Sequence, residues 1–465
     1  MKIGFVSLAH LSDWTGITRL TDRNAQAMAG RGHRITIISE AAKASTKTPV
    51  SQLAYPHELI TVDLKSTQGL KAAREKITAS GLDVCSAAFG DKQMIYMPHL
   101  FRGSGIPLII GEHADPRVFS YARWSPYEHY GSLAFADALH ILLADYLPYY
   151  PGPLREKAHV IGNPAPPPAA VDFGARRSKT ERCIIGVGRL NEEDKRFSML
   201  LRAFALLAAD FPAWRLRLVG DGPYHDFYHV MAGQLGIKER VDFTGAVADV
   251  DAQYNDADIF CLPSFFAEGL PMTFLEASAH ALPLVGYSSC VASKALIGPG
   301  MGALADADDA GNNTPEALAD ALHGLMVLSP EERERIGMHS RDSLQKHYGE
   351  QDIFDAWEKL FESVGQKGAK MENKPTPGIG PEWEGLTPDS PVWSEKTLMA
   401  AAVELANRAD PAAAPEETEV DYQSENVRLR SELVTLRRDF AALEKKYATL
   451  AGQFAVLSGG RGKRR

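Results

Sequence analysis

Two glutamates in one segment provide the clearest candidate chemistry in this chain. Glu268 and Glu276 lie eight positions apart in PSFFAEGLPMTFLEASAHALPLVG, residues 263–286. Gly269 stands beside the first glutamate, directly before a predicted helix. A helix N-terminus presents unpaired N–H groups and the positive end of the helix dipole. The segment therefore predicts a place for an anion, most naturally a phosphate, with two carboxylates close to it.

The elements around this segment follow from its pattern of apolar residues. Short apolar runs at 258–262 and 284–285 are typical of buried strands, and Met272, Leu275 and Ala279 recur at helical spacing. Pro271 is expected at the first helical position, where a missing N–H costs nothing. The predicted order is strand, loop, helix, strand, with Glu268 in the loop and Glu276 inside the helix.

The nine residues EGLPMTFLE, 268–276, resemble the E-x7-E element of retaining glycosyltransferases with the GT-B fold, most closely those of family 4. In that family the first glutamate lies near the transferred sugar, and the second binds the ribose of the nucleotide. The resemblance implies a catalytic role for Glu268 and donor binding by Glu276, Gly269 and Leu270. The alternative is a capping glutamate and a solvated helix glutamate without a shared function.

Two further segments of the second half carry the same resemblance. GRLNEEDKRF, 188–197, is similar to the family segment whose Arg and Lys bind the donor diphosphate, which implies that role for Arg189 and Lys195. Arginine offers a fixed fork of donors and lysine a compact charge. Gly245 and Val247, after the strand that ends in FTG, are expected against the nucleotide base. Plain surface charge is the alternative for the Arg and Lys.

Two loops of the first half complete the candidate site. In GEHADPR, 111–117, His113 resembles the family histidine that contacts the transferred sugar, and Gly111 stands where the family has a serine. A neutral imidazole both donates and accepts hydrogen bonds, which suits a sugar. In SDWTGIT, 12–18, only Gly16 remains of the glycine pair that usually approaches the donor diphosphate. The alternative for His113 is a purely structural histidine, and the alternative for the loop with Gly16 is an ordinary turn.

Composition excludes several other classes of protein. The chain has 465 residues and a net charge of −9, which gives no electrostatic footprint for nucleic acid. No window approaches the ~20 apolar residues of a membrane span. The four cysteines show no metal-ligand spacing and are expected as buried free thiols. We therefore expect a cytoplasmic protein that needs no metal or other cofactor. Peripheral contact with the inner membrane face is compatible with this expectation.

Alternating strand and helix patterns predict an α/β fold with parallel sheets covered on both faces. The resemblance implies two Rossmann-like domains that face a cleft, the GT-B arrangement. The first domain, 1–164, is expected on the acceptor side, and the second, 165–368, is expected to bind the nucleotide sugar. Residues 165–180, rich in proline, predict a connection without helix or strand. The helix at 352–361 is expected to cross back to the first domain, as the last helix of GT-B proteins does.

The last hundred residues lie outside the resemblance. Residues 369–424 have the composition of a disordered linker. Apolar residues from Leu429 to Leu457 recur at intervals of four and three, which predicts a coiled coil over 425–458 and a homo-oligomer. A single amphipathic helix packed on the body is the alternative.

Together these features predict a retaining glycosyltransferase that moves a sugar from a nucleotide-diphosphate sugar, with UDP-sugar favoured, to a hydroxyl of a glycan or lipid-linked glycan. A related GT-B sugar-nucleotide epimerase is the alternative among enzymes. A non-catalytic assembly protein that acts through its coiled coil is the alternative outside them.

Overall fold

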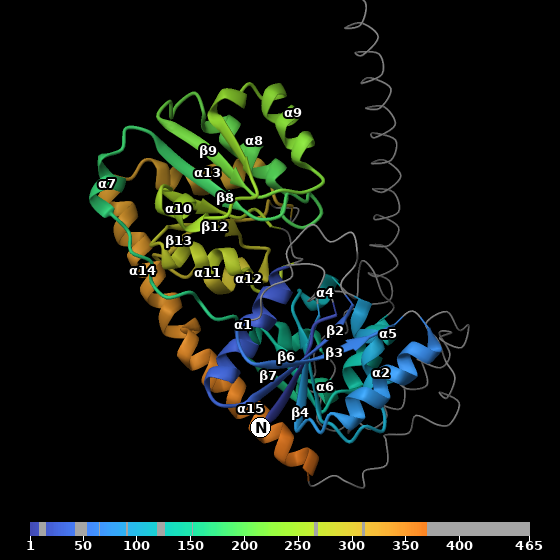
Figure 1. The fold of residues 1–465 in the computed structure, drawn as a ribbon. Coiled ribbons are helices and arrows are strands. Elements are labelled where there is room, and N and C mark those ends of the chain that lie inside the picture. Colours follow the sequence, from blue (N-terminus) through green and yellow to red (C-terminus); the bar gives the residue numbers. More distant parts are fainter. Residues whose placement is uncertain are drawn as a thin grey trace, which may run out of the picture. The chain divides into compact units, whose positions relative to one another are not determined.

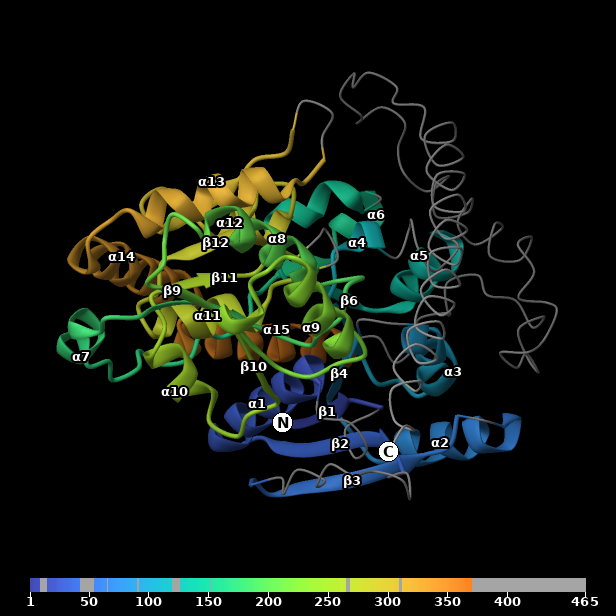
Figure 2. The same cartoon turned by 90° about the horizontal axis from the view of Figure 1, so that it is seen from above.

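The computed structural model describes residues 1–8, 15–41, 54–64, 66–89, 92–118, 126–150, 152–264, 268–308 and 312–369. Two parallel sheets organise this part of the chain, and helices cover their faces (Figures 1 and 2). The predicted α/β class with two Rossmann-like domains is confirmed. The linker and the coiled coil predicted for 369–424 and 425–458 lie outside the described residues, apart from Ala369 at the end of the last helix.

The first sheet has the order β3-β2-β1-β4-β5-β6-β7. Its strands are β1 (Lys2–Val6), β2 (Arg34–Glu40), β3 (His57–Val62), β4 (Val84–Phe89), β5 (Leu108–Glu112), β6 (Ala138–Ile141) and β7 (Ala158–Val160). The helices between them are α1 (Gly16–Gly30), α2 (Thr67–Ala79), α3 (Met97–Phe101), α4 (Pro116–Val118), α5 (Pro126–Phe135) and α6 (Gly152–Arg155), with 3-10 turns at Lys92–Tyr96 and Ala144–Tyr149.

The second sheet has the order β10-β9-β8-β11-β12-β13. Its strands are β8 (Arg182–Val187), β9 (Trp214–Val219), β10 (Val241–Gly245), β11 (Ile259–Cys261), β12 (Leu284–Tyr287) and β13 (Gly302–Ala305). Its helices are α7 (Phe173–Ser178), α8 (Phe197–Leu207), α9 (His225–Gln234), α10 (Val250–Asn255), α11 (Met272–Ala279), α12 (Val291–Leu296), α13 (Pro315–Met326) and α14 (Pro330–Tyr348), with a 3-10 turn at Lys238–Arg240.

The central strands are mostly apolar because helices cover both of their faces. Five of the six residues of β8, from Cys183 to Val187, are buried, and in β5 all five are. All four cysteines are free and buried within these cores, as expected.

The last helix, α15 (Glu350–Ala369), packs on the first sheet although it follows the second in the chain. Trp357 and Phe361 are buried against strand residues of the first domain, and the Phe361 ring meets the edge of Phe5 at 5.6 Å between ring centroids. Arg31, the C-cap of α1, also pairs with Glu358 at 2.6 Å. The crossover of the last helix is therefore confirmed, and its apolar stripe is the physical reason for it.

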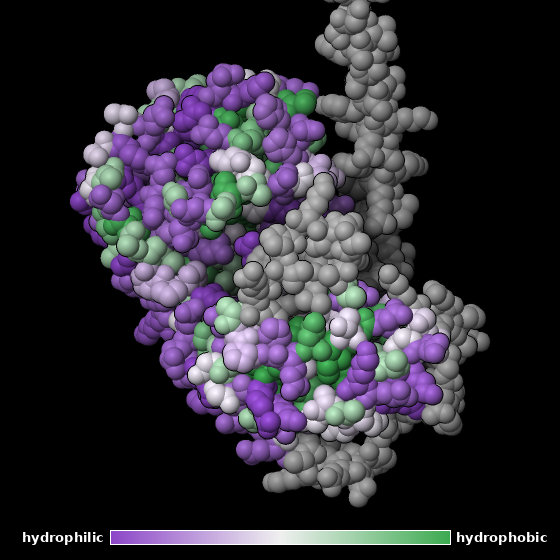
Figure 3. Space-filling model, in the orientation of Figure 1, coloured by the Kyte–Doolittle hydropathy of each residue, from purple (hydrophilic) through white to green (hydrophobic). Residues whose placement is uncertain are grey.

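No helix in the described part of the chain is both long and apolar enough to cross a membrane. Figure 3 shows a mostly hydrophilic face on the second domain, whereas hydrophobic residues gather on the first domain over β2 and β3. Leu59 of β3 is 46% exposed.

The expectation that 165–180 holds no helix is wrong, because α7 lies within it. Asp172 caps this helix by accepting a hydrogen bond from the N–H of Ala175 at 2.9 Å. Arg176 is buried, and its guanidinium donates to the carbonyls of Asn255, Tyr254, His280 and Ala281 at 3.1–3.3 Å. These contacts are between residues far apart in sequence, so local composition could not reveal them.

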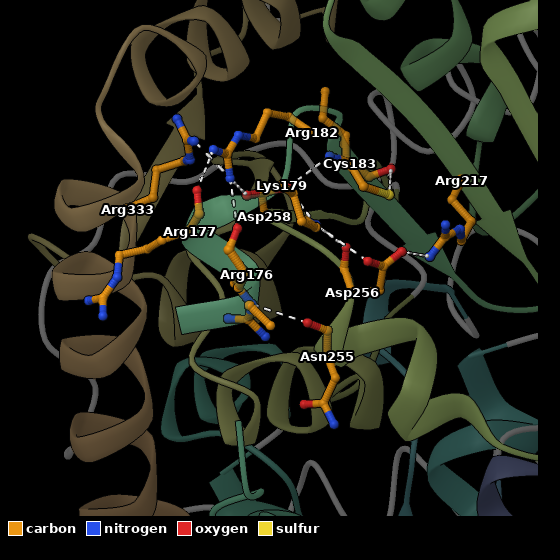
Figure 4. A network of polar contacts seen from close by, with 12 residues as sticks. Arg176, Arg177, Lys179, Arg182, Cys183, Arg217, Asn255, Asp256, Asp258 and Arg333 are labelled. Carbon is orange, nitrogen blue, oxygen red and sulfur yellow. Dashed lines mark hydrogen bonds and ion pairs between the residues drawn. The ribbon is translucent and has the colours of Figure 1, made fainter. Parts of the chain in front are cut away.

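A charged network continues from α7 to the start of β11 (Figure 4). Asp258 is buried, and its carboxylate pairs with Arg182 at 3.2 Å and Lys179 at 3.1 Å. It also accepts a hydrogen bond from the backbone N–H of Cys183 at 2.9 Å. The network ties the connection between the domains to the second sheet.

Candidate active site

The order of the second sheet reverses between β8 and β11, and ligands of open parallel sheets bind beyond the strand ends at such a switch point. The loop after β8 carries Lys195, and the loop after β11 carries Glu268. Two segments that are over seventy residues apart in sequence therefore meet where a ligand is expected.

Lys195, Glu268 and Ser264 are joined directly at this point. The Lys195 ammonium donates to Oε1 of Glu268, and the Ser264 hydroxyl donates to the same oxygen at 2.8 Å. Lys195 and Glu268 side chains are 18% and 12% exposed, so the pair is largely screened from solvent. A phosphate oxygen near Lys195 would compete with the carboxylate for the ammonium.

The loop that carries Glu268 also contacts the first domain through its backbone. Tyr146 donates its hydroxyl hydrogen between two carbonyls, those of Glu268 at 2.7 Å and Gly269 at 2.8 Å. The Asn163 amide donates to the carbonyl of Leu270 at 2.7 Å. These bonds to backbone oxygens fix the path of the loop and leave the Glu268 side chain available for other contacts.

Gly269 is required by a close approach of two backbones. A Cβ at this position would lie 2.4 Å from the carbonyl oxygen of His113 and 2.8 Å from a methyl carbon of Leu142. Ala114 and Glu268 also form an isolated β-bridge. Any side chain at 269 would therefore separate the Glu268 loop from the His113 loop.

Glu276 lies inside α11 and accepts a hydrogen bond from the Tyr254 hydroxyl at 2.9 Å. Burial raises the pKa of Glu276, and the Tyr254 hydrogen bond together with the charge of Arg19 opposes part of that rise. The Tyr254 ring stacks on His280 at 5.2 Å, which holds its hydroxyl in place. Glu276 is thus a positioned carboxylate and not a solvated helix residue.

Pro271 is the N-cap of α11, not its first helical residue as predicted. Its φ of −62° suits a helix, but its ψ of 122° is extended, so the helix begins at Met272. Pro271 has no side-chain hydrogen bond to the helix. The first N–H groups of α11 therefore remain without a side-chain cap from this residue.

His113 directly follows β5, and its backbone N–H donates to the carbonyl of Phe89 at 2.8 Å. Burial and the nearby His140 lower the pKa of His113 to about 3, so its ring is neutral at neutral pH. Its side chain is partly exposed and makes no hydrogen bond to the described residues. The ring is thus free to contact a ligand.

The carboxylates beside His113 are engaged within the protein. Glu112 is buried and accepts hydrogen bonds from His129 and from the Tyr150 hydroxyl. Asp115 is buried and pairs with Arg117 at 2.6 Å. They support the loop around His113.

Four predicted donor-binding residues lie at strand ends or a helix start, without a hydrogen bond or ion pair to Glu268 in the described structure. Arg189 follows β8, is exposed and has no ion-pair partner among the described residues. Gly245 ends β10 with a φ of 67°, and Val247 is half-buried just after it. Gly16 begins α1, which Thr15 caps, and no atom lies within 4 Å of where its Cβ would be.

The sequence reasoning missed the residues that hold the site residues in place: Tyr146, Asn163, Tyr254 and Ser264. Ser264 belongs to the segment 263–286 singled out from the sequence, so its position was visible although its partner was not. Nothing in the sequence marks Tyr146 or Tyr254. The described residues contain no group of three or more His, Cys, Asp or Glu that could hold a metal ion.

Comparison with known proteins finds similar sequences and similar folds. Residues 181–327 match the family model for glycosyl transferases group 1. An uncharacterized glycosyltransferase of Haemophilus influenzae is 30% identical over 184 residues, which are 39% of this chain and 49% of that protein. The chain thus spans about half of that relative's length.

A second relative is matched over a larger share of its length. It is the GalNAc-alpha-(1->4)-GalNAc-alpha-(1->3)-diNAcBac-PP-undecaprenol alpha-1,4-N-acetyl-D-galactosaminyltransferase of Campylobacter jejuni, 29% identical over 56% of this chain and 70% of that protein. Anabaena Alr3699/HepE, solved in complex with UDP and glucose, superposes with a TM-score of 0.64 at 17% identity, over 78% of this chain and 100% of that chain.

The fold and the strand-end site define a two-domain protein of the GT-B type. Within its second domain, residues 181–327 match the model for glycosyl transferases group 1, and the Haemophilus and Campylobacter relatives carry the names of glycosyltransferases.

Proposed function

We propose that this protein is a retaining glycosyltransferase that moves a sugar from a nucleotide-diphosphate sugar to a hydroxyl of a glycan or lipid-linked glycan. The observation that carries the proposal is that Lys195 and Ser264 both donate to the Glu268 carboxylate at the switch point of the second sheet. It joins a cation suited to a diphosphate with a carboxylate suited to a sugar.

UDP-sugar is the favoured donor. Alr3699/HepE has been solved with UDP-glucose, and its fold covers 80% of this chain. In our proposal Glu276 holds the ribose, and Gly245 and Val247 lie against the base. Gly16, Gly269 and Leu270 border the rest of the donor.

The cations of this chain would stabilise the negative charge that develops on the diphosphate. Arg189 is exposed and unpaired among the described residues, and Lys195 can exchange Glu268 for a phosphate oxygen. The uncapped N–H groups at the start of α11 add fixed partial positive charge. No metal or other cofactor takes part in this proposal.

The bond changes follow from retention without a covalent enzyme intermediate. The bond between the anomeric carbon and the phosphate oxygen breaks, and a bond to the acceptor oxygen forms on the same face. The acceptor proton passes to the departing phosphate. Glu268 and His113 would position the sugar during this exchange.

A lipid-linked acceptor suits two observations. The name of the Campylobacter relative includes an undecaprenol-linked glycan. Hydrophobic residues also gather on one face of the first domain, the proposed acceptor side (Figure 3). We extend the proposal to a cytoplasmic enzyme, peripheral at the membrane, that forms a homo-oligomer through 425–458. The domain limits 1–164 and 165–368 are part of the same proposal.

Calorimetric titration with UDP, GDP and ADP, without added metal, tests the donor site. We expect wild type to bind UDP best and Arg189→Ala to bind it at least tenfold more weakly. Arg202→Ala, exposed on α8, is the matched control and should bind like wild type. Absence of binding to all three nucleotides would contradict the proposal and favour an assembly protein.

Incubation with a UDP-sugar alone separates the enzyme alternatives. An epimerase converts the donor without an acceptor, whereas a transferase requires one to form product.

A further inference from the structure

The Tyr254 ring of α10 lies against two residues of α11 that are one helical turn apart. Glu276 lies within α11, and His280 is the C-cap of the same helix. Residues four apart in a helix lie on the same face. The Tyr254 hydroxyl donates to Oε2 of Glu276 at 2.9 Å. Its ring stacks on His280 with 5.2 Å between centroids and 27° between planes, so the tyrosine bridges the two residues.

The ring of His280 is itself held at both nitrogens. Nδ1 lies 2.8 Å from Oδ1 of Asn255, and Nε2 lies 3.2 Å from Oδ1 of Asp251. Asp251 and Asn255 are four apart in α10, on one face of that helix. An amide offers both a donor and an acceptor, so Asn255 matches Nδ1 whether or not that nitrogen carries a hydrogen. The plane of the His280 ring is therefore fixed by α10, the helix that also carries Tyr254.

Burial and one arginine hold the two helices together at this point. Tyr254 is fully buried, and His280 is 3% exposed. Arg176 donates to the carbonyls of Asn255 and Tyr254, at the end of α10 (Figure 4). The same guanidinium donates to the carbonyl of His280, at the end of α11. The unpaired carbonyls of both helix C-termini thus share one buried cation.

The Tyr254 bond leaves Glu276 with one oxygen to offer to a ligand. Oε2 is engaged by Tyr254, while Oε1 has no hydrogen-bond partner among the described residues. Glu276 is half-buried, and Oε1 is not enclosed within the protein. The charged groups that act on the pKa of Glu276 are Arg19 and Arg23 of α1, which lower it, and Asp251, which raises it. A ligand hydroxyl would therefore meet a single carboxylate oxygen whose direction Tyr254 sets.

We propose that His280 is a positioning residue for Glu276, acting through the Tyr254 ring. His280 fixes the plane of that ring, and the ring directs the hydroxyl that holds Oε2, so Oε1 points in one direction. The ligand class that suits Oε1 is a hydroxyl donor. Under the proposed function this donor is a ribose hydroxyl of the nucleotide, and that step rests on the proposed function. The positioning of Glu276 does not, because it involves only groups of this chain.

A fixed single acceptor makes the donor site selective for ribonucleotides. A site built to hydrogen-bond a hydroxyl rejects an analogue that lacks it, because the acceptor is then left unpaired. Of 2′-deoxy-UDP and 3′-deoxy-UDP, the one without the hydroxyl that Glu276 accepts from should bind wild type about tenfold more weakly than UDP. His280→Ala should reduce this difference. Equal binding of all three nucleotides to wild type would overturn the assignment of Oε1 to the ribose.

Carbon-13 nuclear magnetic resonance of the ligand-free full chain tests the positioning without any activity. Glutamate labelled at the side-chain carboxyl carbon reports each pKa, and Glu276→Gln identifies the Glu276 signal. The Tyr254 hydrogen bond lowers the pKa of Glu276, so Tyr254→Phe sets the size of the expected rise. We expect His280→Ala to raise this pKa as well, and the double variant to raise it no further than Tyr254→Phe alone. An unchanged pKa in His280→Ala, or a further rise in the double variant, would overturn the proposal.

Asn255→Ala is the milder test, because it removes one anchor of the His280 ring and leaves the ring itself in place. It should raise the pKa of Glu276 by less than His280→Ala does. If His280→Ala does not fold, Asn255→Ala decides: a rise supports the proposal, and an unchanged pKa overturns it. His347→Ala, exposed on α14, is the control and should match wild type.

Calorimetric titration with UDP separates this inference from the proposed function. We expect His280→Ala and Tyr254→Phe each to weaken UDP binding about tenfold, and His280→Ala to add nothing in a Glu276→Ala background. If wild type binds UDP but the pKa of Glu276 is the same with and without His280, the inference fails and the proposed function stands. If the pKa responds but UDP, GDP and ADP all fail to bind, the positioning stands and the proposed function fails.

Discussion

Replacement of Gly269 with alanine tests the contact between the Glu268 loop and the first domain. The added Cβ would sit 2.4 Å from the carbonyl oxygen of His113, which is backbone and cannot rotate away. Overpacking of this kind costs about 1–3 kcal/mol. Displacing the loop also weakens the two hydrogen bonds from Tyr146, each worth about 0.5–1.5 kcal/mol. We expect the free energy of unfolding to fall by about 2–4 kcal/mol.

Urea unfolding measures this loss, and Gly233→Ala provides the matched control. Gly233 lies in α9, and no atom lies within 4 Å of its Cβ position, so alanine there should be neutral or stabilise by up to about 1 kcal/mol. A shift of the loop also moves Glu268, so kcat/KM should fall about 10–100-fold. If Gly269→Ala were as stable and active as Gly233→Ala, the close approach would not exist in solution.

Three further predictions follow from the same structure. Tyr254→Phe removes the hydrogen bond that lowers the pKa of Glu276, so that pKa should rise. The loss of UDP binding on acidification should then begin at a higher pH in titrations between pH 4 and 8. An unchanged pH dependence would mean that Glu276 does not contact the nucleotide. Asp258→Asn leaves Lys179 and Arg182 without their buried partner and should lower the free energy of unfolding by about 3 kcal/mol. Asp226 is fully exposed on α9, so Asp226→Asn is the control and should leave that free energy unchanged. His140 has a pKa of about 4 in the folded chain and about 6.5 in the unfolded chain. Between these two pH values only the unfolded chain binds the proton. The free energy of unfolding should therefore fall as the pH is lowered from 6.5 toward 4. His140→Asn should flatten that fall in urea titrations at each pH, and an unchanged slope would argue against a buried neutral His140.

The strands were predictable because a parallel sheet covered on both faces demands continuous apolar runs. Runs such as RITIIS and CIIGV can form little else, and their alternation with helical patterns predicts two parallel sheets. The helix α7 was not predicted, because it depends on contacts between distant residues and not on a local pattern. Its proline-rich surroundings disfavour a helix locally, yet the buried guanidinium of Arg176 bonds to carbonyls about 78 to 105 residues away.

In the candidate site, too, some residues could be predicted from the sequence and others could not. Glu268, Lys195 and His113 were recognisable because their segments resemble the motifs of a known glycosyltransferase family. Their segments also follow apolar strands, where parallel sheets place their ligands. Their partners were not recognisable. Tyr146 and Tyr254 reach the site from elements with no distinguishing spacing, and only the packed chain brings their hydroxyls within hydrogen-bond distance of site residues. The same packing places the His140 ring 5.3 Å from that of His113.

The sequence by itself determined the class of fold and the loops that carry the chemistry, because apolar periodicity and strand-end loops are local properties of a chain. Only the tertiary structure decided how those loops meet. The ion pair of Lys195 with Glu268, the backbone approach at Gly269 and the approach of the His113 and His140 rings each join segments that are distant in sequence. Such contacts form when two sheets and a crossing helix have packed, since hydrogen bonds and steric exclusion act only at close range.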